Sequence, residues 1–485
     1  MKKRVLIVFT AALMLVLLVS VTSAQSGPPG SGYWFGATHQ NVGSGPATVV
    51  VTAYDSNSSA TYSYSPAPLA QGASLNVGPS DIPGLPAGFI GSIVTSSDQA
   101  LVALVNVTNR LAGGFGVAGG KSAAIYSGVD GATASTNLRF PLAKNNHFNK
   151  TTTFYLQNAG SAATTIAVTF AFGGTNYPYT TPSVAPGQMV AVDPGLASVP
   201  SGNGNVGAMT LTAGQPIAGA MLEHEHTSPV GTVLQGSSGF SPGELDQTVF
   251  CPTIKKNHFG RTSGLQVQNT HSATQNVTVT YIGTSGTFVR NITNLAPGAS
   301  TTLINDANIT SGTLFAARVV GSAGPVAGIV NESELPLVNP LQTSTTYNCQ
   351  AESTATNTIS YPAFKETFFG RTTALQVQNV GNSAANNVVL KFTDNNNNVR
   401  TTQPQTIAAG ASSVLVCVSS NSALWSGASL GASTLSGVII TSNQPIIAVA
   451  NEASWASANP CTPDNTGPSS FDKATSNAFN LAAAP

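Results

Sequence analysis

The chain has 485 residues, of which only 7% are charged and 41% are hydrophobic. An average soluble domain carries about 25% charged residues, and a nucleic-acid-binding protein usually displays a strongly basic patch. The composition therefore argues against nucleic acid as a partner. Because the hydrophobic residues stand in alternating runs that can fill cores, it also argues against a disordered chain.

The first 24 residues have the three parts of a secretory signal peptide. A basic head, Lys2-Lys3-Arg4, precedes an apolar run from Val5 to about Val19 and small residues up to Ala24. We therefore expect export and cleavage after Ala24, although an uncleaved anchor is the alternative. Cleavage would leave 15 basic against 18 acidic residues, a net charge near −3. No later stretch is apolar for long enough to predict a membrane span.

A unit of roughly 110 residues occurs four times along the rest of the chain. Each copy has a Gln-Asn pair, and the four asparagines are spaced 117, 111 and 110 residues apart: Asn41, Asn158, Asn269 and Asn379. In the last three copies a proline and a basic residue precede the pair at constant spacing, as in Pro252 and Arg261. Tandem units of this size predict an array of small domains, and such arrays usually bind or build rather than catalyse.

Strand patterns dominate each unit. Residues 265–268 and 277–281 alternate apolar and polar, and the matching segments of the fourth copy do the same. A glycine turn, such as Ala296-Pro-Gly298, leads into the next strand. A nearly continuous apolar run, such as residues 325–331, closes each unit as a buried strand. About seven short strands per hundred residues predict an antiparallel β-sandwich.

These strands and turns resemble the immunoglobulin-like modules strung together in secreted bacterial surface proteins, including those described as cell-adhesion-related. The resemblance implies an all-β fold of four tandem antiparallel immunoglobulin-like β-sandwich domains after a signal peptide. It carries over no site residues, because the Cys…Trp…Cys pattern of antibody domains is absent. The expected divisions are a signal peptide at 1–24, repeats at 25–125, 126–239 and 240–346, and a fourth repeat with a C-terminal tail strand at 347–485.

Four cysteines in an exported chain predict disulfides, and four allow three pairings. We expect Cys251–Cys349, because both residues flank the third unit, and Cys417–Cys461, because both lie in the fourth. In the chain-entropy model, closing a loop of about 100 residues adds about 4–5 kcal/mol. The first two units have no cysteine, so the fold does not depend on these bridges.

Two repeat positions carry opposite charges together. In the first copy both positions are neutral, at Tyr33 and Val107, whereas the other three copies have a basic residue at one and glutamate at the other. Joint gain and loss of charge predicts a contact within each unit. The predicted structural ion pairs are Lys150–Glu223, Arg261–Glu332 and Arg371–Glu452. The alternative is that these glutamates bind a ligand or metal.

The chain ends leave two interpretations open. Each unit is followed by a connector that begins with an aromatic residue, and after the fourth unit a connector runs from Phe471 to Pro485. The first unit, after cleavage, lacks the residues equivalent to Phe140-Pro141. The tail strand therefore either completes the fourth unit or is donated to the first unit of another molecule. Donation would build head-to-tail filaments.

Few residues suggest chemistry. Glu223-His224-Glu225-His226 is the densest group of ligand-type side chains, and alternate residues on a strand share a face. The other copies lose the histidines, so a solvated strand end is the favoured interpretation. Trp34, Trp425 and Trp455 would suit sugar stacking but follow no repeat pattern. No nucleophile elbow, zinc-protease helix or phosphate loop occurs.

We therefore expect a secreted, non-enzymatic structural or interaction protein of the cell surface, without cofactors. Its most specific form would be a filament or surface-layer subunit. The first alternative is a monomeric carbohydrate- or matrix-binding adhesin, and the second is a hydrolase with an unrecognised site. Expected partners are other copies of the chain, other cell-surface proteins and glycans, with no nucleic acid and no membrane span.

Overall fold

The computed structural model describes residues 27–28, 32–109, 123–226, 233–258, 260–283, 285–304, 309–334, 344–368, 371–415, 418–454 and 473–482. Within them the regular structure is β-strand, apart from short 3-10 turns, and the strand pairs are antiparallel. The predicted all-β, antiparallel class is confirmed. The leader, Cys417 and Cys461 lie outside the described residues. None of the helices in the described part is long and apolar enough to span a membrane.

The first repeat places seven strands in two sheets. They are β1 (Tyr33–Asn41), β2 (Val49–Asp55), β3 (Thr61–Tyr64), β4 (Ser74–Val77), β5 (Gly91–Ser97), β6 (Leu101–Asn109) and β7 (Ala123–Ser127). One sheet has the order β4-β1-β6-β7 and the other the order β3-β2-β5. A 3-10 turn, η1 (Pro79–Asp81), joins β4 to β5. The arrangement is sandwich-like, with a buried apolar cluster formed by alternate residues of β2 and their neighbours.

The second repeat begins with an additional strand. It contains β8 (Ser135–Lys144), β9 (Lys150–Asn158), β10 (Ile166–Phe172), β11 (Thr175–Thr180), β12 (Met189–Val192), η2 (Pro194–Ala197), β13 (Val206–Glu225) and β14 (Leu234–Ser238). The 20-residue β13 joins both layers. Its first half pairs with β10 and β8, and its second half pairs with β9 and β14.

The third repeat has the same layout. Its elements are η3 (Pro242–Glu244), β15 (Thr248–Lys256), β16 (Arg261–Asn269), β17 (Gln275–Gly283), β18 (Gly286–Leu295), β19 (Ser300–Ile304), β20 (Thr313–Gly321), β21 (Val326–Glu334), β22 (Ser344–Asn348) and β23 (Gln350–Ala351). The sheets have the orders β18-β17-β20-β15-β23 and β19-β16-β21-β22. The predicted disulfide Cys251–Cys349 is present and buried, and joins β15 to the residue between β22 and β23.

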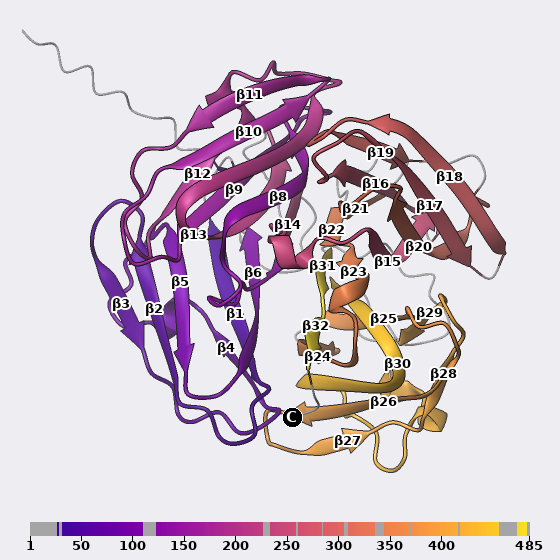
Figure 1. Ribbon diagram of the computed structural model, residues 1–485. Helices are drawn as coiled ribbons and strands as arrows, with labels where there is room; N and C mark the ends of the chain where they lie inside the picture. Colours follow the sequence, from indigo (N-terminus) through magenta and orange to yellow (C-terminus); the bar gives the residue numbers. More distant parts are fainter. Residues whose placement is uncertain are drawn as a thin grey trace, which may run out of the picture.

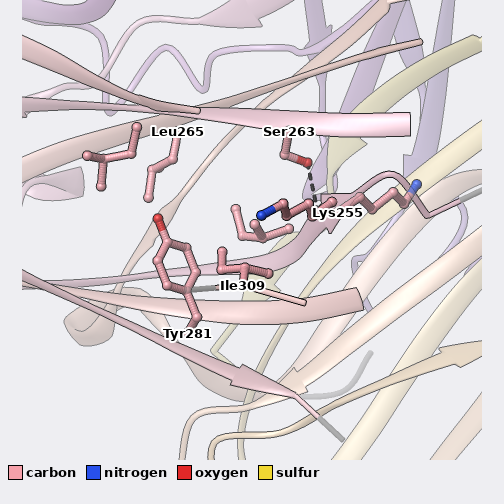
Figure 2. A pocket seen from close by; sticks show the side chains of 8 residues that line it. Lys255, Ser263, Leu265, Tyr281 and Ile309 are labelled. Atoms are coloured by element: carbon pink, nitrogen blue, oxygen red, sulfur yellow. Dashed lines mark hydrogen bonds between the residues drawn. The ribbon is translucent and has the colours of Figure 1, made fainter. Parts of the chain in front are cut away.

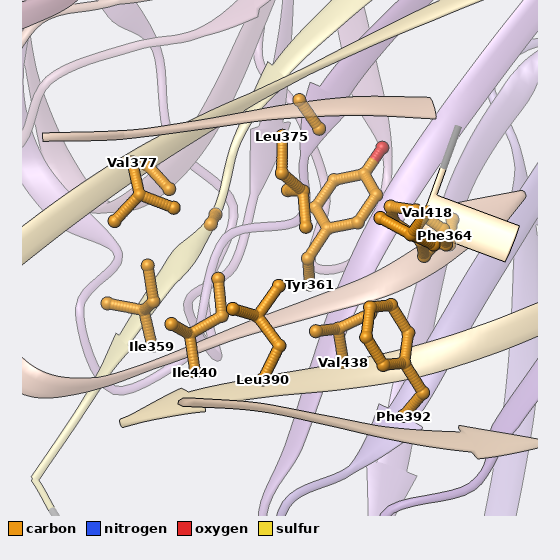
Figure 3. Packing of buried hydrophobic residues seen from close by; sticks show 14 of the residues in the cluster. Ile359, Tyr361, Phe364, Leu375, Val377, Leu390, Phe392, Val418, Val438 and Ile440 are labelled. Carbon is orange, nitrogen blue, oxygen red and sulfur yellow. The ribbon is translucent and has the colours of Figure 1, made fainter. Parts of the chain in front are cut away.

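The fourth repeat again joins its layers through one long strand, β30. Its elements are η4 (Glu352–Thr354), β24 (Thr356–Glu366), β25 (Arg371–Asn379), β26 (Ala385–Asp394), β27 (Val399–Thr401), β28 (Gln405–Ile407), β29 (Ser412–Leu415), η5 (Val418–Ser420), η6 (Ser422–Leu424), β30 (Thr434–Ser454), β31 (Lys473–Asn477) and β32 (Phe479–Leu481). Figure 3 shows its core, where Phe364 and Phe392 meet edge to face between the layers.

The repeated asparagine has a clear structural role. In all four copies its side chain is fully buried. In the fourth, Asn379 Nδ2 donates to the carbonyls of Ser383 and Ile407 at 2.8 and 2.9 Å, while Oδ1 accepts from Gly381 N at 2.9 Å. The other three asparagines make the same three bonds. Asparagine recurs because a buried turn with two open carbonyls needs both amide donors.

The four repeats close into a ring (Figure 1). Four short strands, one near the end of each repeat, meet at its centre, and each lies against two of the others: β7, β14, β22 and β31. Asn348 Nδ2 donates to Ser238 O at 2.8 Å, and Asn477 Nδ2 donates to Asn348 O at 2.6 Å. These axial strands contain the expected divisions 125/126 and 346/347, because the aromatic residue that opens the connector lies within the strand and not in a linker.

Neighbouring repeats meet at four seams around the ring. At three of them, the residue at one position of the closing strand packs into the core of the neighbouring repeat. Leu104 of the first repeat packs in the core of the fourth, Val449 of the fourth in that of the third, and Ile329 of the third in that of the second. The second repeat has the small Ala220 here. Its cross-strand neighbour Tyr155 is large and contributes to the seam with the first repeat.

The C-terminal tail strand lies within its own repeat. β32 pairs with β24, with Ile359 opposite Asn480. The third repeat makes the same closure between β23 and β15, and the second makes a single bridge between Phe240 and Arg139. Of the two interpretations of the tail, the structure therefore shows the one in which it completes the fourth repeat.

Candidate functional site

The charged residues singled out by the repeat comparison lie together in three buried clusters. Lys150 Nζ is 3.6 Å from Glu223 Oε1, and Arg261 Nη1 is 3.3 Å from Glu332 Oε1. Arg371 forms the corresponding pair with Glu452. The basic residue begins the second strand of its repeat and the glutamate is near the end of the closing strand, two antiparallel neighbours. The structure thus brings together each of the three pairs.

Each glutamate also holds a second cation that the sequence comparison missed. Lys144, Lys255 and Lys365 approach Glu223, Glu332 and Glu452 at 2.8, 2.7 and 2.6 Å. All three lie on the first strand of their repeat, three residues after its proline. That constant spacing was the available signal. In the first repeat Gly27 stands at the position of the lysine and Val107 at that of the glutamate, so these two charges are also absent together.

These clusters lie near contacts between repeats. Asn331 of the third repeat donates from Nδ2 to Glu223 Oε2 of the second at 3.2 Å. Gln235 Nε2 donates to Glu223 Oε1 at 2.8 Å. At the seam between the second and first repeats, the position of Asn331 is taken by Leu222, which packs in one cluster with Val107. At the seam between the second and third repeats, a polar residue thus faces the glutamate. At the seam between the first and second repeats, an apolar residue faces the valine that replaces it.

The electrostatics favour charged glutamates. Burial opposes ionisation of Glu452, but the attraction of Lys365 and Arg371 outweighs it and lowers the pKa of Glu452 to about 2. The same balance, with Lys144 and Lys150, lowers the pKa of Glu223. Burial in turn lowers the pKa of Lys150, although Glu223 partly compensates.

This arrangement suits structural pairing better than catalysis. Glu223 is fully buried, and each of its oxygens already has two partners: Lys150 and Gln235 on Oε1, Lys144 and Asn331 on Oε2. A substrate would have to displace one of them. The geometry fixes the register of four strands in one repeat, β8, β9, β13 and β14, and of β21 in the next, the role best attested for buried ion pairs.

The histidines of the Glu223–His226 segment face threonines. His224 Nε2 lies 2.9 Å from Thr153 Oγ1 and its Nδ1 2.9 Å from Glu225 O. His226 Nδ1 lies 2.7 Å from Thr151 Oγ1. Both nitrogens of His224 are therefore engaged. Within the described ranges, no group of three or more His, Cys, Asp or Glu side chains is arranged to hold a metal ion.

The described tryptophans are packed inside the protein. Trp425 is 5% exposed, its Nε1 donates to Val418 O at 2.7 Å, and its ring centroid lies 5.4 Å from that of Phe392. Trp34 is half-buried against Gly78. Trp425 therefore presents no open face suited to a sugar. Trp455 lies outside the described residues.

A small cavity lies in the third repeat (Figure 2). Its volume is ≈ 10 Å³, about the space of one water molecule. Leu265, Tyr281 and Ile309 form its apolar wall, and the backbone N–H of Lys255 already donates to Ser263 Oγ at 3.0 Å. This space is a packing gap too small for an organic substrate.

The first repeat differs from the others in its core. His39 and Thr95 face each other across the two sheets, with Nε2 and Oγ1 2.9 Å apart. The equivalent pairs are Leu156–Leu211 in the second repeat and Val267–Val319 in the third, all buried. His39 is 2% exposed, and burial lowers its pKa to about 4.

We expect His39 to make the protein sensitive to acid. The folded-state pKa lies below the value of about 6.5 in an unfolded chain, so protonation favours unfolding, and stability present above pH 6.5 is lost as the pH falls towards 4. The loss should reach about 2 kcal/mol at pH 5. Urea denaturation of His39→Val at pH 7 and pH 5 should show a correspondingly smaller pH effect than the parent. His271→Asn, in a turn, is the control, and equal pH effects in His39→Val and the parent would contradict the assignment.

No family model matches the chain, and no curated protein does. Among solved structures, the crystal structure of Thermotoga maritima 1070 is similar to part of it, at 18% identity, and covers 22% of this chain and 94% of that one. The TM-score of this likeness is 0.19.

Proposed function

We propose that the chain is a secreted, non-enzymatic interaction protein of the cell surface, in which four immunoglobulin-like β-sandwich repeats act as one closed ring. Export rests on the leader at residues 1–24. The main support for a closed ring is the contact between the first and fourth repeats, in which Leu104 packs into the core of the fourth. It joins the two ends of the array within a single chain.

This closure favours a monomeric adhesin over a filament subunit. Head-to-tail contacts form a ring when the rotation closes and an open fibre when it does not. Here Ser74 Oγ of the first repeat donates to Pro362 O of the fourth at 2.6 Å, and Ser412 Oγ of the fourth donates to Pro252 O of the third at 3.0 Å. The first and fourth repeats, which would meet between molecules in a filament, thus contact each other inside one molecule, and the tail strand is paired as well.

The charged clusters support a non-enzymatic role. An active site normally lies in one copy of a repeat and departs from the pattern, whereas these clusters recur in three copies with the same geometry. Their carboxylates are buried and have cationic partners. A scaffold that presents its outer strands and loops to other surface proteins or glycans fits these observations.

Size-exclusion chromatography with light scattering tests the ring. Residues 25–485 should run as a compact monomer at all concentrations. A chain shortened to residues 25–470 loses β31 and β32, and with them one axial strand, so it should self-associate and unfold at a lower temperature. Polymers from the longer chain together with monomers from the shorter one would contradict the proposal and restore the filament.

A further inference from the structure

Among the described residues, one sheet edge in the first repeat has no counterpart of the strand that the other repeats have there. In the second, third and fourth repeats the first strand, β8, β15 or β24, pairs with β13, β20 or β30 respectively. In the first repeat, β5 corresponds to β13, β20 and β30 of the others. Among the described residues its ladder partner is β2, on one side only, and it forms the edge of the sheet β3-β2-β5 (Figure 1).

The exposure of β5 reflects this missing neighbour. Val319 of β20 and Leu211 of β13 are 0% and 1% exposed, whereas Thr95 at the same core-facing position is half-buried. Val94, on the outer face, is 37% exposed. The core beneath is less well covered too, since Phe35, Phe89, Ile93 and Leu101 pack against it only partly buried.

The second repeat covers part of this edge, and that contact limits the length of β5 to which another strand could pair. Ser92 Oγ donates to Gly187 O at 2.6 Å, and Gln188 Nε2 donates to Ser58 O at 2.6 Å. The first bond fixes the start of β5 against the second repeat, and the second fixes the turn between β2 and β3. The segment from Ile93 to Ser97 is the part left for an added strand.

The three resident strands show what would fit this edge. Each sends apolar side chains inward between its sheets, as Leu138 and Phe140 do from β8 and Ile359 and Tyr361 do from β24, all at most 3% exposed. Each also carries the lysine of the charge cluster. The first repeat has Val107 in place of the glutamate, so a strand added there needs no lysine.

The chain itself is a poor source for this strand. By the spacing of Asn41 and Asn158, the residues equivalent to β8 are 18–27, which put Ser23 and Gln25 where β8 has Phe140 and Leu142. Most of them belong to the expected leader. The tail strand β32 is already paired with β24.

We propose that β5 is a docking edge for an extended segment of another polypeptide, which adds to the sheet as an antiparallel strand with alternating apolar side chains. The ladder bonds would give affinity and the inward apolar residues specificity, as in other cases of strand addition. The inference rests on the proposed interaction role and names its partner class, a peptide strand.

The test mixes residues 25–485 with a synthetic peptide that has the sequence Ser135–Lys144. Fluorescence anisotropy measures the binding, and hydrogen–deuterium exchange locates it. The peptide should bind and slow exchange in residues 93–97. A peptide carrying Leu138→Ser and Phe140→Ser should bind more weakly by more than about tenfold. Val94→Lys with Ser96→Lys should weaken binding similarly, because charges on an edge oppose strand addition. Val289→Lys, exposed on β18, is the matched control and should leave binding unchanged.

Three results would overturn the docking edge. The first is no protection of residues 93–97 by the peptide. The second is protection without peptide in protein that retains residues 1–24, which would assign the edge to the leader. The third is protection that grows with protein concentration, which would assign it to a second copy. A monomeric ring with no peptide binding would remove this inference and leave the proposed function standing, whereas a filament would remove the proposed function.

Discussion

Replacing Glu452 by alanine is expected to lower the free energy of unfolding by about 3–5 kcal/mol, the usual cost of removing one partner from a buried ion pair. Glu452 is 1% exposed, and its removal leaves Lys365 and Arg371 facing each other without a counter-charge. Urea denaturation followed through tryptophan fluorescence should report the change, because Trp425 packs in the core of the same repeat.

The first repeat supplies the matched control. It has Tyr33 and Val107 at the positions of Arg371 and Glu452 and remains folded without the cluster. Lys365→Met, Arg371→Tyr and Glu452→Val together remove all three charges, and should destabilise less than Glu452→Ala alone. If the single change costs less than about 1 kcal/mol, or the triple change costs more than the single one, the cluster is not a coupled ion network.

Acid should act on the same cluster. The pKa of Glu452 is about 2 in the folded protein, below the ordinary value of 4.5. The stability that it contributes is therefore fully present above pH 4.5 and is lost as the pH falls through 2. In the triple variant, the part of the acid destabilisation that comes from the fourth repeat should be absent.

Repeat comparison predicted local features well and the ring not at all. Lys150–Glu223 and its two equivalents were predictable because both positions change together in the first copy. Lys144, Lys255 and Lys365 also have a neutral counterpart, Gly27, but it lies ahead of Tyr33, where the recognisable part of the first copy begins. Cys251–Cys349 was predictable because both cysteines flank one repeat, a matter of chain position alone.

Ring closure depends on the rotation from each repeat to the next, which no strand period encodes. One repeat position in the closing strand nevertheless differs in size according to the neighbouring repeat. Leu104, Ile329 and Val449 are large where the closing strand enters a neighbouring core, and Ala220 is small beside the first repeat, whose described residues include no equivalent of β8. Apolar residues in a closing strand are also expected in any buried strand. The contacts between repeats are therefore needed before this pattern can be interpreted.

Leu104→Asp is expected to open the ring between the first and fourth repeats. Leu104 is 2% exposed and packs among residues of the fourth repeat, so a carboxylate there would be buried without a partner. Leu104→Ala should cost about 2–5 kcal/mol through the lost packing alone. Opening the seam frees two surfaces that fit each other, one on each end of the array, and these should then join between molecules. Light scattering should show oligomers whose mass rises with protein concentration.

Ala220→Asp is the control, because it places the same side chain at the same repeat position, where the native residue is partly exposed. It should leave a monomer of parental stability. Oligomers from Leu104→Asp and a monomer from Ala220→Asp would show that the surfaces of a filament exist in this protein and are held inside one molecule by its first and last repeats. A stable monomer from Leu104→Asp would instead mean that the axial strands hold the ring closed without this seam.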